Sequence, residues 1–340
     1  MNAMLDEERP DVTVTVSCTA RLHLGFFDLE GGLGRRFGSI GLSLDQPVTQ
    51  LVARRSQTTR ISGPEHERVA RYLTLMCTRL GLSEPHEIEV RQAMPPHAGL
   101  GSGTQLALAV ATAVRRLHGY PDDPRADAAY LERGARSGIG IGLFSQGGLV
   151  IDGGRSDRRA DRAEPPPVLA RAATPEAWRV LLVLDRDRQG LSGSRERAAF
   201  DALGPMDSAV SGAICRLVLM QALPALAEQD LPAFGAAITA IQEHVGDYFA
   251  PSQGGRFASP QVGAALDLLA QAGATGIGQS SWGPTGFAFA ASDSEAQRLA
   301  GILRNSGVLG AASVGPAGGM TKRLDLLICR VLNRGALVTT

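Results

Sequence analysis

One ten-residue segment constrains this chain more than any other, because it can serve few purposes. The run PHAGLGSGTQ at 96–105 joins a predicted strand, 86–91, to a predicted apolar helix, 105–117. Glycines let a backbone take positive φ and approach an anion closely, and the N–H groups that open the helix point at that anion. The spacing is neither that of a Walker loop nor that of a dinucleotide fingerprint. The segment therefore predicts a phosphate-binding loop; the alternative is a plain glycine turn before a helix cap.

Residues 99–105 of this loop are the candidate ligands for phosphate. Ser102 and Thr104 add hydroxyl groups, which also suit Mg²⁺ beside a phosphate. The predicted phosphate-binding residues are Gly99, Leu100, Gly101, Ser102, Gly103, Thr104 and Gln105, with Ser102 and Thr104 as the predicted metal ligands.

Composition narrows the class of protein. The 340 residues are 44% hydrophobic, with 34 basic against 34 acidic residues, so no overall charge draws the chain to nucleic acid or to a membrane surface. The four cysteines lie far apart, without metal or redox spacing. The segment 1–10 is polar and unlike a signal peptide, and no apolar run is expected to reach the length of a membrane span. We expect a soluble cytoplasmic enzyme.

Strands and helices alternate irregularly along the chain, which indicates an α+β protein of two halves. Predicted strands lie at 12–18, 22–28, 40–44, 86–91, 145–152, 180–185, 287–291 and 325–331. Predicted helices lie at 67–80, 105–117, 124–135, 194–203, 208–228, 232–245, 260–272 and 295–305. The charged, proline-rich stretch 155–167 is predicted to be a surface loop or a domain boundary.

The loop resembles the phosphate-binding motif of the GHMP kinase superfamily, whose members include galacto-, homoserine and mevalonate kinases. The other two motifs of that superfamily resemble ARLHLG at 20–25 and GIGQSSWGPTG at 276–286. The resemblance implies a two-domain fold, with a ribosomal-S5-domain-2-like half at 12–175 that carries the loop and a ferredoxin-like half at 176–331.

The chain departs from the kinases where their catalytic acid is expected. Many of them carry an aspartate before a Gly-Gly pair, whereas this chain reads SGIGIGLFSQGG at 137–148, with Gly140 and Ile141 in place of the acid. The first-motif lysine is also replaced, near that position, by Arg21. A glycine cannot accept a proton. The sequence therefore predicts a phosphate-binding loop without the residues needed for phosphoryl transfer.

One branch of the superfamily is similar in these departures, the β-ribofuranosylaminobenzene 5′-phosphate synthase family. The similarity is carried by RLHLGFFD at 21–28, GSIGL at 38–42, PHAGLGSGTQ at 96–105, IGLFSQGG at 141–148 and GQSSWGPT at 278–285. It implies joining 5-phosphoribosyl 1-pyrophosphate to 4-aminobenzoate or 4-hydroxybenzoate, with release of CO₂ and pyrophosphate, in the biosynthesis of methanopterin-type cofactors. It also implies Mg²⁺ and a homodimer, with no nucleic-acid or membrane partner.

Four side chains are candidates for catalysis, each with a structural alternative. Arg21 is predicted to clamp the carboxylate of the benzoate, since guanidinium pairs bidentately with carboxylate; otherwise it forms a surface ion pair. His23, His97 and Asp28 are candidate acceptors near the para substituent. The alternatives are structural roles for the two histidines and a turn cap for the aspartate.

The predicted substrate-binding residues come from the segments around two glutamines. They are Gln146, Gln279, Ser280, Ser281 and Trp282. The glutamines are alternatively buried amides that brace loops, and Trp282 is alternatively a core residue. Two other functions stay open at this point: an ATP-dependent small-molecule kinase of the same superfamily, and a phosphometabolite sensor without catalysis.

Overall fold

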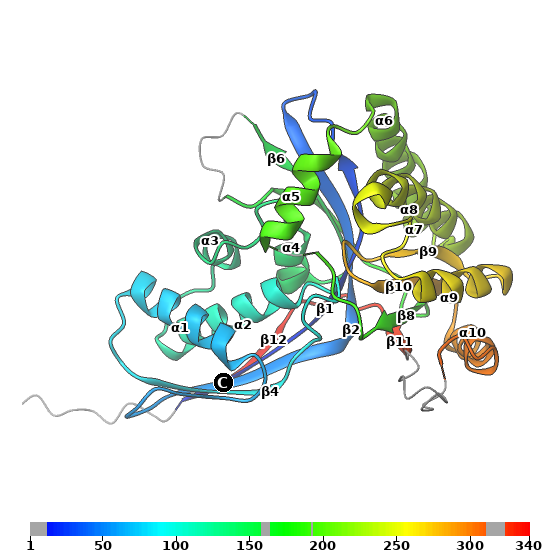
Figure 1. Ribbon diagram of the computed structural model, residues 1–340. Coiled ribbons are helices and arrows are strands. Elements are labelled where there is room, and N and C mark those ends of the chain that lie inside the picture. Colours follow the sequence, from blue (N-terminus) through cyan, green and yellow to red (C-terminus); the bar gives the residue numbers. More distant parts are fainter. Residues whose placement is uncertain (1–11, 158–163, 192, 311–323) are drawn as a thin grey trace, which may run out of the picture.

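The computed structural model describes residues 12–157, 164–191, 193–310 and 324–340 (Figure 1). Within these ranges the first half of the chain builds one sheet and the helices over it. Its strands are β1 (Thr13–Asp28), β2 (Arg35–Arg55), β3 (Arg60–Ser62), β4 (His86–Gln92), β5 (Leu149–Asp152), β6 (Arg155–Ser156) and β7 (Val168–Ala172), joined by β12 (Leu337–Thr339). Its helices are α1 (His66–Leu80), α2 (Ser102–Leu117), α3 (Pro124–Tyr130) and α4 (Ile139–Gln146).

The second half builds a smaller sheet with its own helices. Its strands are β8 (Arg179–Asp185), β9 (Thr275–Gln279), β10 (Thr285–Ala290) and β11 (Leu324–Arg330). Its helical segments are α5 (Gly193–Leu203), α6 (Ser208–Leu217), the π-helical turn η1 (Val218–Ala222), α7 (Leu223–Ala227), α8 (Leu231–Gln253), α9 (Pro260–Gln271) and α10 (Asp293–Asn305). The predicted division at 175/176 falls between β7 and β8, although β12 returns to pair with β1.

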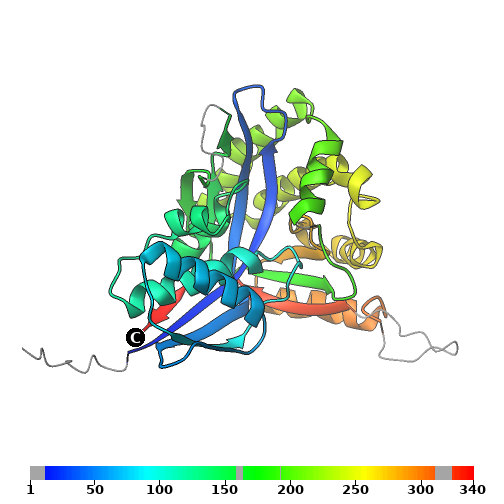
Figure 2. The same ribbon diagram turned by 60° about the vertical axis from the view of Figure 1, so that its left-hand side comes forward.

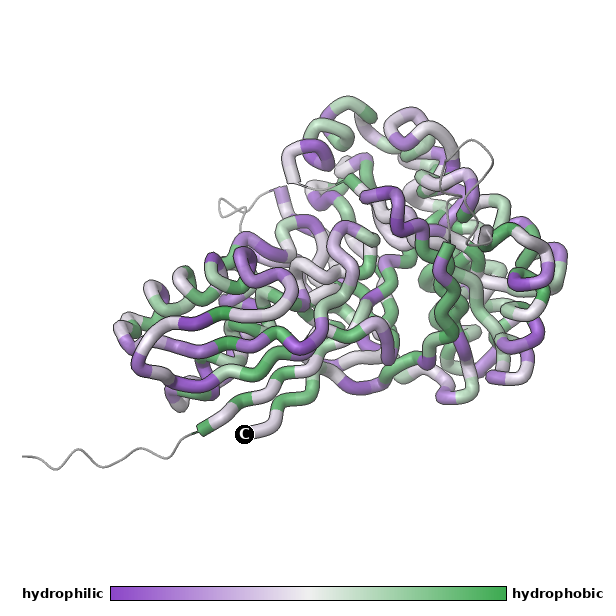
Figure 3. The backbone as a smooth tube through the Cα atoms, turned by 60° about the horizontal axis from the view of Figure 1, so that its bottom comes forward, coloured by the Kyte–Doolittle hydropathy of each residue, from purple (hydrophilic) through white to green (hydrophobic). Residues whose placement is uncertain are grey.

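The long hairpin of β1 and β2 is the central element of the first sheet and runs through the centre of the molecule (Figure 2). Buried and half-buried residues alternate along the start of β1, and Figure 3 shows the matching alternation of hydrophobic and hydrophilic residues along the long strands. The register shifts twice, between Thr19 and Arg21 and between His23 and Gly25. Such irregularities re-aim side chains, so the candidates Arg21 and His23 come from a distorted part of the strand.

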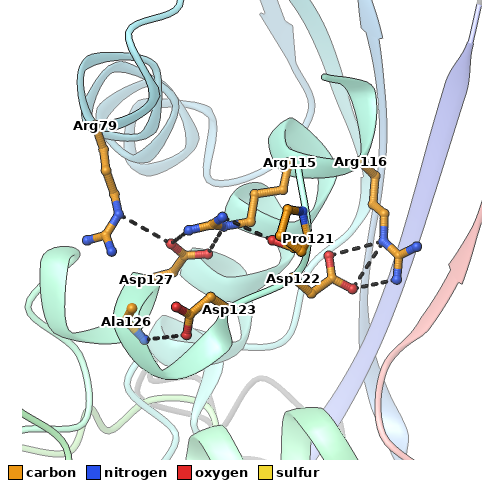
Figure 4. A network of polar contacts seen from close by, with 8 residues as sticks. All are labelled: Arg79, Arg115, Arg116, Pro121, Asp122, Asp123, Ala126 and Asp127. Atoms are coloured by element: carbon orange, nitrogen blue, oxygen red, sulfur yellow. Dashed lines mark hydrogen bonds and ion pairs between the residues drawn. The ribbon is translucent and has the colours of Figure 1, made fainter. Parts of the chain in front are cut away.

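Helix α2 crosses the first sheet and packs against β1, β2 and α1. It is apolar on every side because sheet and helices enclose it, and all but four of its sixteen residues are buried. Its far end is fixed by a buried ion pair: Arg115 donates to both carboxylate oxygens of Asp127 on α3, at 2.6 and 2.7 Å (Figure 4). The start of α2, which carries the glycine loop, is therefore held on a rigid support.

The second sheet has the order β11-β8-β10-β9, with all neighbours antiparallel. In chain order this is 4-1-3-2, the order of a ferredoxin-like sheet. Alternate residues of β8 face opposite ways: Leu181 and Val183 join a core with α9 and α10, whereas Leu182 and Leu184 join the main core. The predicted α+β, two-part architecture is confirmed.

One prediction about apolar segments is wrong. Helix α6, the turn η1 and helix α7 form one continuous helix, Ser208–Ala227, which is long and apolar enough to span a membrane by length and composition. A third of its apolar stretch is buried inside the protein. Ile214, Val218 and Ala222 pack into the core, whereas Leu219 and Met220 are exposed. The core helix of a soluble protein passes the same test of length and composition, so this is weak evidence for a span.

Candidate active site

A cavity of about 540 Å³ lies where the glycine loop, the β1–β2 hairpin, α4 and α5 meet. Its volume suits a small molecule rather than a macromolecule. Six arginines and three carboxylates line it: Arg21, Arg36, Arg133, Arg136, Arg155 and Arg197, with Glu132, Glu196 and Asp201. The excess of cationic groups in a partly enclosed space favours an anionic ligand.

The glycine loop has the conformation that its sequence predicts. Gly99 and Gly101 have φ of +81° and +78°, which side chains rarely adopt. A Cβ on Gly99 would lie 2.2 Å from the carbonyl oxygen of Ser280, so the loop packs directly on the third glycine-rich segment. Helix α2 begins at Ser102, and the first N–H groups of a helix have no partner within it. Thr104, two residues later, lines the cavity.

Arg21 lies against this loop rather than at a separate carboxylate site. Its Nη1 donates to the carbonyl of Gly99 at 3.2 Å, and its stem fills the space that a Cβ on Gly101 would occupy. Its Nε is buried without a partner among the described residues. Burial lowers the pKa of Arg21 to about 10, partly offset by the nearby carboxylate of Glu196. The position therefore favours contact with phosphate over the predicted role as a carboxylate clamp.

His23 lies two residues further along β1, and its buried ring also faces the cavity. Its Nε2 has no partner among the residues that the structure describes, and the ring packs on Phe26 with 4.3 Å between centroids. Burial lowers the pKa of His23 well below 6.5, and the charge of Arg21 lowers it further. A neutral imidazole that faces the cavity can accept or donate a hydrogen bond but is a weak base.

This shift predicts a pH dependence of stability. Because the folded pKa of His23 lies below its unfolded value, the unfolded state binds more protons as the pH falls below about 6.5, and stability is lost there. We expect His23→Gln to flatten this loss by up to about 1.4 kcal/mol per pH unit. The measurement is the free energy of unfolding between pH 5 and 7.5, with the exposed His66 changed to Gln as control. Equal slopes for the wild type and His23→Gln would contradict the burial argument.

Ser280 joins the three glycine-rich motifs. Its hydroxyl accepts from the backbone N–H of His23 at 3.0 Å and donates to the carbonyl of Gly99 at 2.8 Å. Ser281 follows with a positive φ of 57° and lines the cavity. The segment 276–286 therefore positions both the 20–25 segment and the glycine loop. Of Ser280 and Ser281, only Ser281 lines the cavity.

Gln279 braces a loop and Trp282 is a core residue, as in the structural alternatives to substrate binding. The amide of Gln279 accepts from the N–H of Ala258 at 2.7 Å and donates to the carbonyl of Ser281 at 3.1 Å, so it braces the turn. Trp282 is buried against Phe249, with 4.1 Å between ring centroids. Neither side chain lines the cavity.

Gln105 is also a brace rather than a phosphate ligand by its side chain. Its Nε2 donates to the carbonyl of Gly140 at 2.8 Å and so ties α2 to α4. Gly140 lines the cavity, where a Cβ would lie 3.2 Å from Cγ2 of Thr104. The position expected to hold a kinase's acid thus faces Thr104 with no side chain at all, while Ile141 is buried.

Asp28, His97 and Gln146 also lie outside this cavity. Asp28 accepts from the N–H groups of Glu30 and Gly31, at 2.8 and 3.0 Å, and so caps the turn after β1. His97 is exposed, with a φ of 56°, and its carbonyl accepts from Gly190. Gln146 ends α4 with an exposed side chain. Each follows a motif residue in sequence, but the strand end, the turn and the helix end direct its side chain away.

The cavity residues that sequence reasoning missed come mainly from α5. Arginines of other segments add to them: Arg36, Arg133, Arg136 and Arg155. Helix α5, which Figure 1 shows beside α4, supplies Glu196, Arg197, Phe200 and Asp201 to the cavity. Arg136 pairs with Glu196 at 2.8 Å and lies over the ring of Phe200. The abundance of arginine was the only available signal, because contacts between distant segments cannot be read from spacing.

The described residues offer few protein ligands for a metal ion near the loop. Among the described residues, no group of three or more His, Cys, Asp or Glu side chains could hold a metal ion. Mg²⁺ commonly binds through substrate phosphates, waters and only one or two protein oxygens. Hydroxyl groups beside a phosphate loop fit that pattern; Thr104 lines the cavity, whereas Ser102 does not.

The comparisons with known proteins agree with this geometry. The family described as GHMP kinases N terminal domain matches residues 67–147, and GHMP kinases C terminal matches 222–309. Homoserine kinase from Cytophaga hutchinsonii has a similar fold, with a TM-score of 0.64, 18% identity and coverage of 98% of this chain and 99% of that one. At this identity the likeness shows the fold alone.

Two relatives are similar in sequence over most of their length. A beta-ribofuranosylphenol 5'-phosphate synthase from Archaeoglobus fulgidus is 36% identical over 296 residues, covering 84% of this chain and 90% of that protein. One from Methanothermobacter thermautotrophicus is 30% identical over 310 residues, covering 86% and 92%. The chain therefore belongs to the beta-ribofuranosylphenol 5'-phosphate synthase family of enzymes, which has the GHMP kinase fold.

Proposed function

We propose that this enzyme joins 5-phosphoribosyl 1-pyrophosphate to 4-hydroxybenzoate, with release of CO₂ and pyrophosphate, as an early step of methanopterin-type cofactor synthesis. The observation that carries the proposal is one cavity in which a phosphate-binding loop, Arg21 and Arg133 meet an aromatic wall. The names of the relatives favour a phenol product, so 4-hydroxybenzoate is preferred to 4-aminobenzoate.

The loop end of the cavity suits the pyrophosphate. Thr104 and Arg21 line this end, and we expect the Thr104 hydroxyl, the guanidinium of Arg21 and the N–H groups at the start of α2 to stabilise the charge that develops as pyrophosphate leaves C1 of the ribose. Mg²⁺, if held with the pyrophosphate beside Thr104, would neutralise part of that charge. Arg133, which donates to the hydroxyl of Tyr72 at 2.7 Å, keeps a buried Nε without a partner among the described residues.

The chemistry balances without a covalent enzyme intermediate. The ring carbon that bears the carboxylate forms a bond to C1 while the bond from C1 to pyrophosphate breaks. The carboxylate then leaves as CO₂, and the electrons of its C–C bond restore the aromatic ring. The neutral imidazole of His23 lines the cavity among apolar rings, which would exclude water from the reacting atoms.

The test is incubation of the enzyme with 5-phosphoribosyl 1-pyrophosphate, Mg²⁺ and each benzoate in turn, following pyrophosphate. We expect release that requires the benzoate and is faster with 4-hydroxybenzoate. A parallel reaction with ATP and a sugar, homoserine or mevalonate should give no ADP, because Gly140 supplies no acid. ADP formation with one of these acceptors, without release of pyrophosphate, would favour the kinase instead. We extend the proposal to a homodimer, which light scattering would test by its molar mass. We also extend it to a cytoplasmic location.

A further inference from the structure

The end of the cavity away from the glycine loop contains an arrangement that phosphate binding at the loop does not use. Arg36 on β2 and Arg155 on β6 are directly opposite each other across an antiparallel pair of strands. Both guanidinium groups lie over the same ring, that of Phe37, at 5.9 and 5.7 Å from its centroid. All three residues line the cavity.

Like charges placed directly opposite on paired strands repel each other. Among the described residues, neither Arg36 nor Arg155 forms an ion pair with a carboxylate, and the Nε of Arg36 is buried without a partner. Phe37 itself has a positive φ of 76°, which is strained for an aromatic residue. The guanidinium groups of Arg36 and Arg155 have no carboxylate partner among the described residues and both lie over the strained Phe37. This arrangement favours binding of an anion between them.

The surroundings of this pair are aromatic. The ring of Phe37 packs against those of Phe26 and Phe200, each with 5.7 Å between centroids, and Phe26 packs against His23. All four rings line the cavity. An anion at Arg36 and Arg155 would therefore have an apolar wall of aromatic faces and edges beside it, which suits a ligand with a ring and a carboxylate.

The position is separate from the loop. Arg21 pairs with Ser43 across the hairpin, whereas Phe37 pairs with Asp28. The two positions therefore lie at different points along the hairpin, with His23 and Phe26 between them. Two cationic regions in one cavity match two anionic substrates.

Resting on the function proposed above, we propose that Arg36 and Arg155 form the carboxylate subsite and that Phe26, Phe37 and Phe200 hold the ring of the aromatic acid. This places the carboxylate clamp at the hairpin end and leaves Arg21 to the phosphate end. The ligand class is a planar aromatic carboxylate; the 5-phosphate of the ribosyl substrate is the competing occupant.

The test uses Arg36→Gln and Arg155→Gln, with Arg54→Gln as the matched control. Arg54 lies on the same strand β2 and pairs with Glu87 on the surface. We expect each cavity variant to raise the KM for 4-hydroxybenzoate by about 10–100-fold, since a charge-assisted hydrogen bond is lost, and to leave the KM for the ribosyl pyrophosphate unchanged. The control should change neither.

A second readout keeps this test independent of turnover. Calorimetry with inorganic pyrophosphate present should show 4-hydroxybenzoate binding to the wild type but about 10–100-fold more weakly to Arg155→Gln. The neutral 4-hydroxybenzamide should not distinguish them. Failure to release CO₂ from any benzoate would overturn the proposed function, whatever the calorimetry shows. Equal benzoate affinity in both proteins, no benzoate binding to the wild type, or a rise in the KM of the ribosyl substrate alone would overturn the subsite.

Discussion

Replacing Arg21 with Met is expected to lower kcat/KM by about 10²–10³-fold, the cost of removing one preorganised donor from a developing oxyanion. The guanidinium lies on the glycine loop, bonded to the Gly99 carbonyl, and its Nε is unpartnered among the described residues. Most of the effect should fall on the ribosyl pyrophosphate rather than on the benzoate. Steady-state kinetics with each substrate varied in turn is the measurement.

Stability is the control for this prediction. Burial lowers the pKa of Arg21 to about 10, so its charge is held at a cost in the free protein. We therefore expect the melting temperature of Arg21→Met to equal or exceed that of the wild type while activity falls. Arg21→Lys, which keeps the charge but not the planar donors, should retain part of the activity. A rise in the benzoate KM alone would return Arg21 to the role of carboxylate clamp.

Introducing an acid where the kinases carry one should also lower activity strongly. We expect Gly140→Asp to lower kcat/KM by about 10²-fold or more, because like charges brought together cost several kcal/mol. Gly140 lines the cavity in contact with Thr104, so the new carboxylate would lie beside the expected position of the pyrophosphate. The variant should not gain kinase activity, since one acid does not rebuild the acceptor site.

The matched control is Gly140→Ala. Its methyl group would lie 3.2 Å from Cγ2 of Thr104, a contact that small shifts relieve, and alanine suits helix α4. We expect it to keep most of its activity. Aspartate in the first turn also favours the helix, so the melting temperature should not fall with Gly140→Asp. Equal losses in the two variants would mean that space rather than charge decides at this position.

The parts of the fold that depend on local pattern could be predicted from the sequence. The glycine loop and the apolar helix after it are confirmed, because positive φ and all-round burial leave clear signatures in residue type. Short patterns were less reliable at the hairpin, where three predicted short strands are two long ones, β1 and β2. Helix α4 and strand β9 were missed because both are rich in glycine.

The sequence motifs located only part of the site. Arg21, His23 and Thr104 line the cavity, whereas Asp28, His97 and Gln146 lie outside it because a strand end, a turn and a helix end direct them elsewhere. The cationic pair at Phe37 depends on pairing between β2 and β6, more than a hundred residues apart. No spacing along the chain encodes that pairing.

The fate of the carboxyl carbon tests the central claim most directly. 4-Hydroxybenzoate labelled with ¹³C in its carboxyl group is incubated with 5-phosphoribosyl 1-pyrophosphate, Mg²⁺ and the enzyme, and the label is followed by NMR together with the pyrophosphate released. The decarboxylating synthase predicts that all consumed label appears as CO₂, one for each pyrophosphate, and that the aromatic product carries none. Label retained in a ribosylated aromatic product would contradict it.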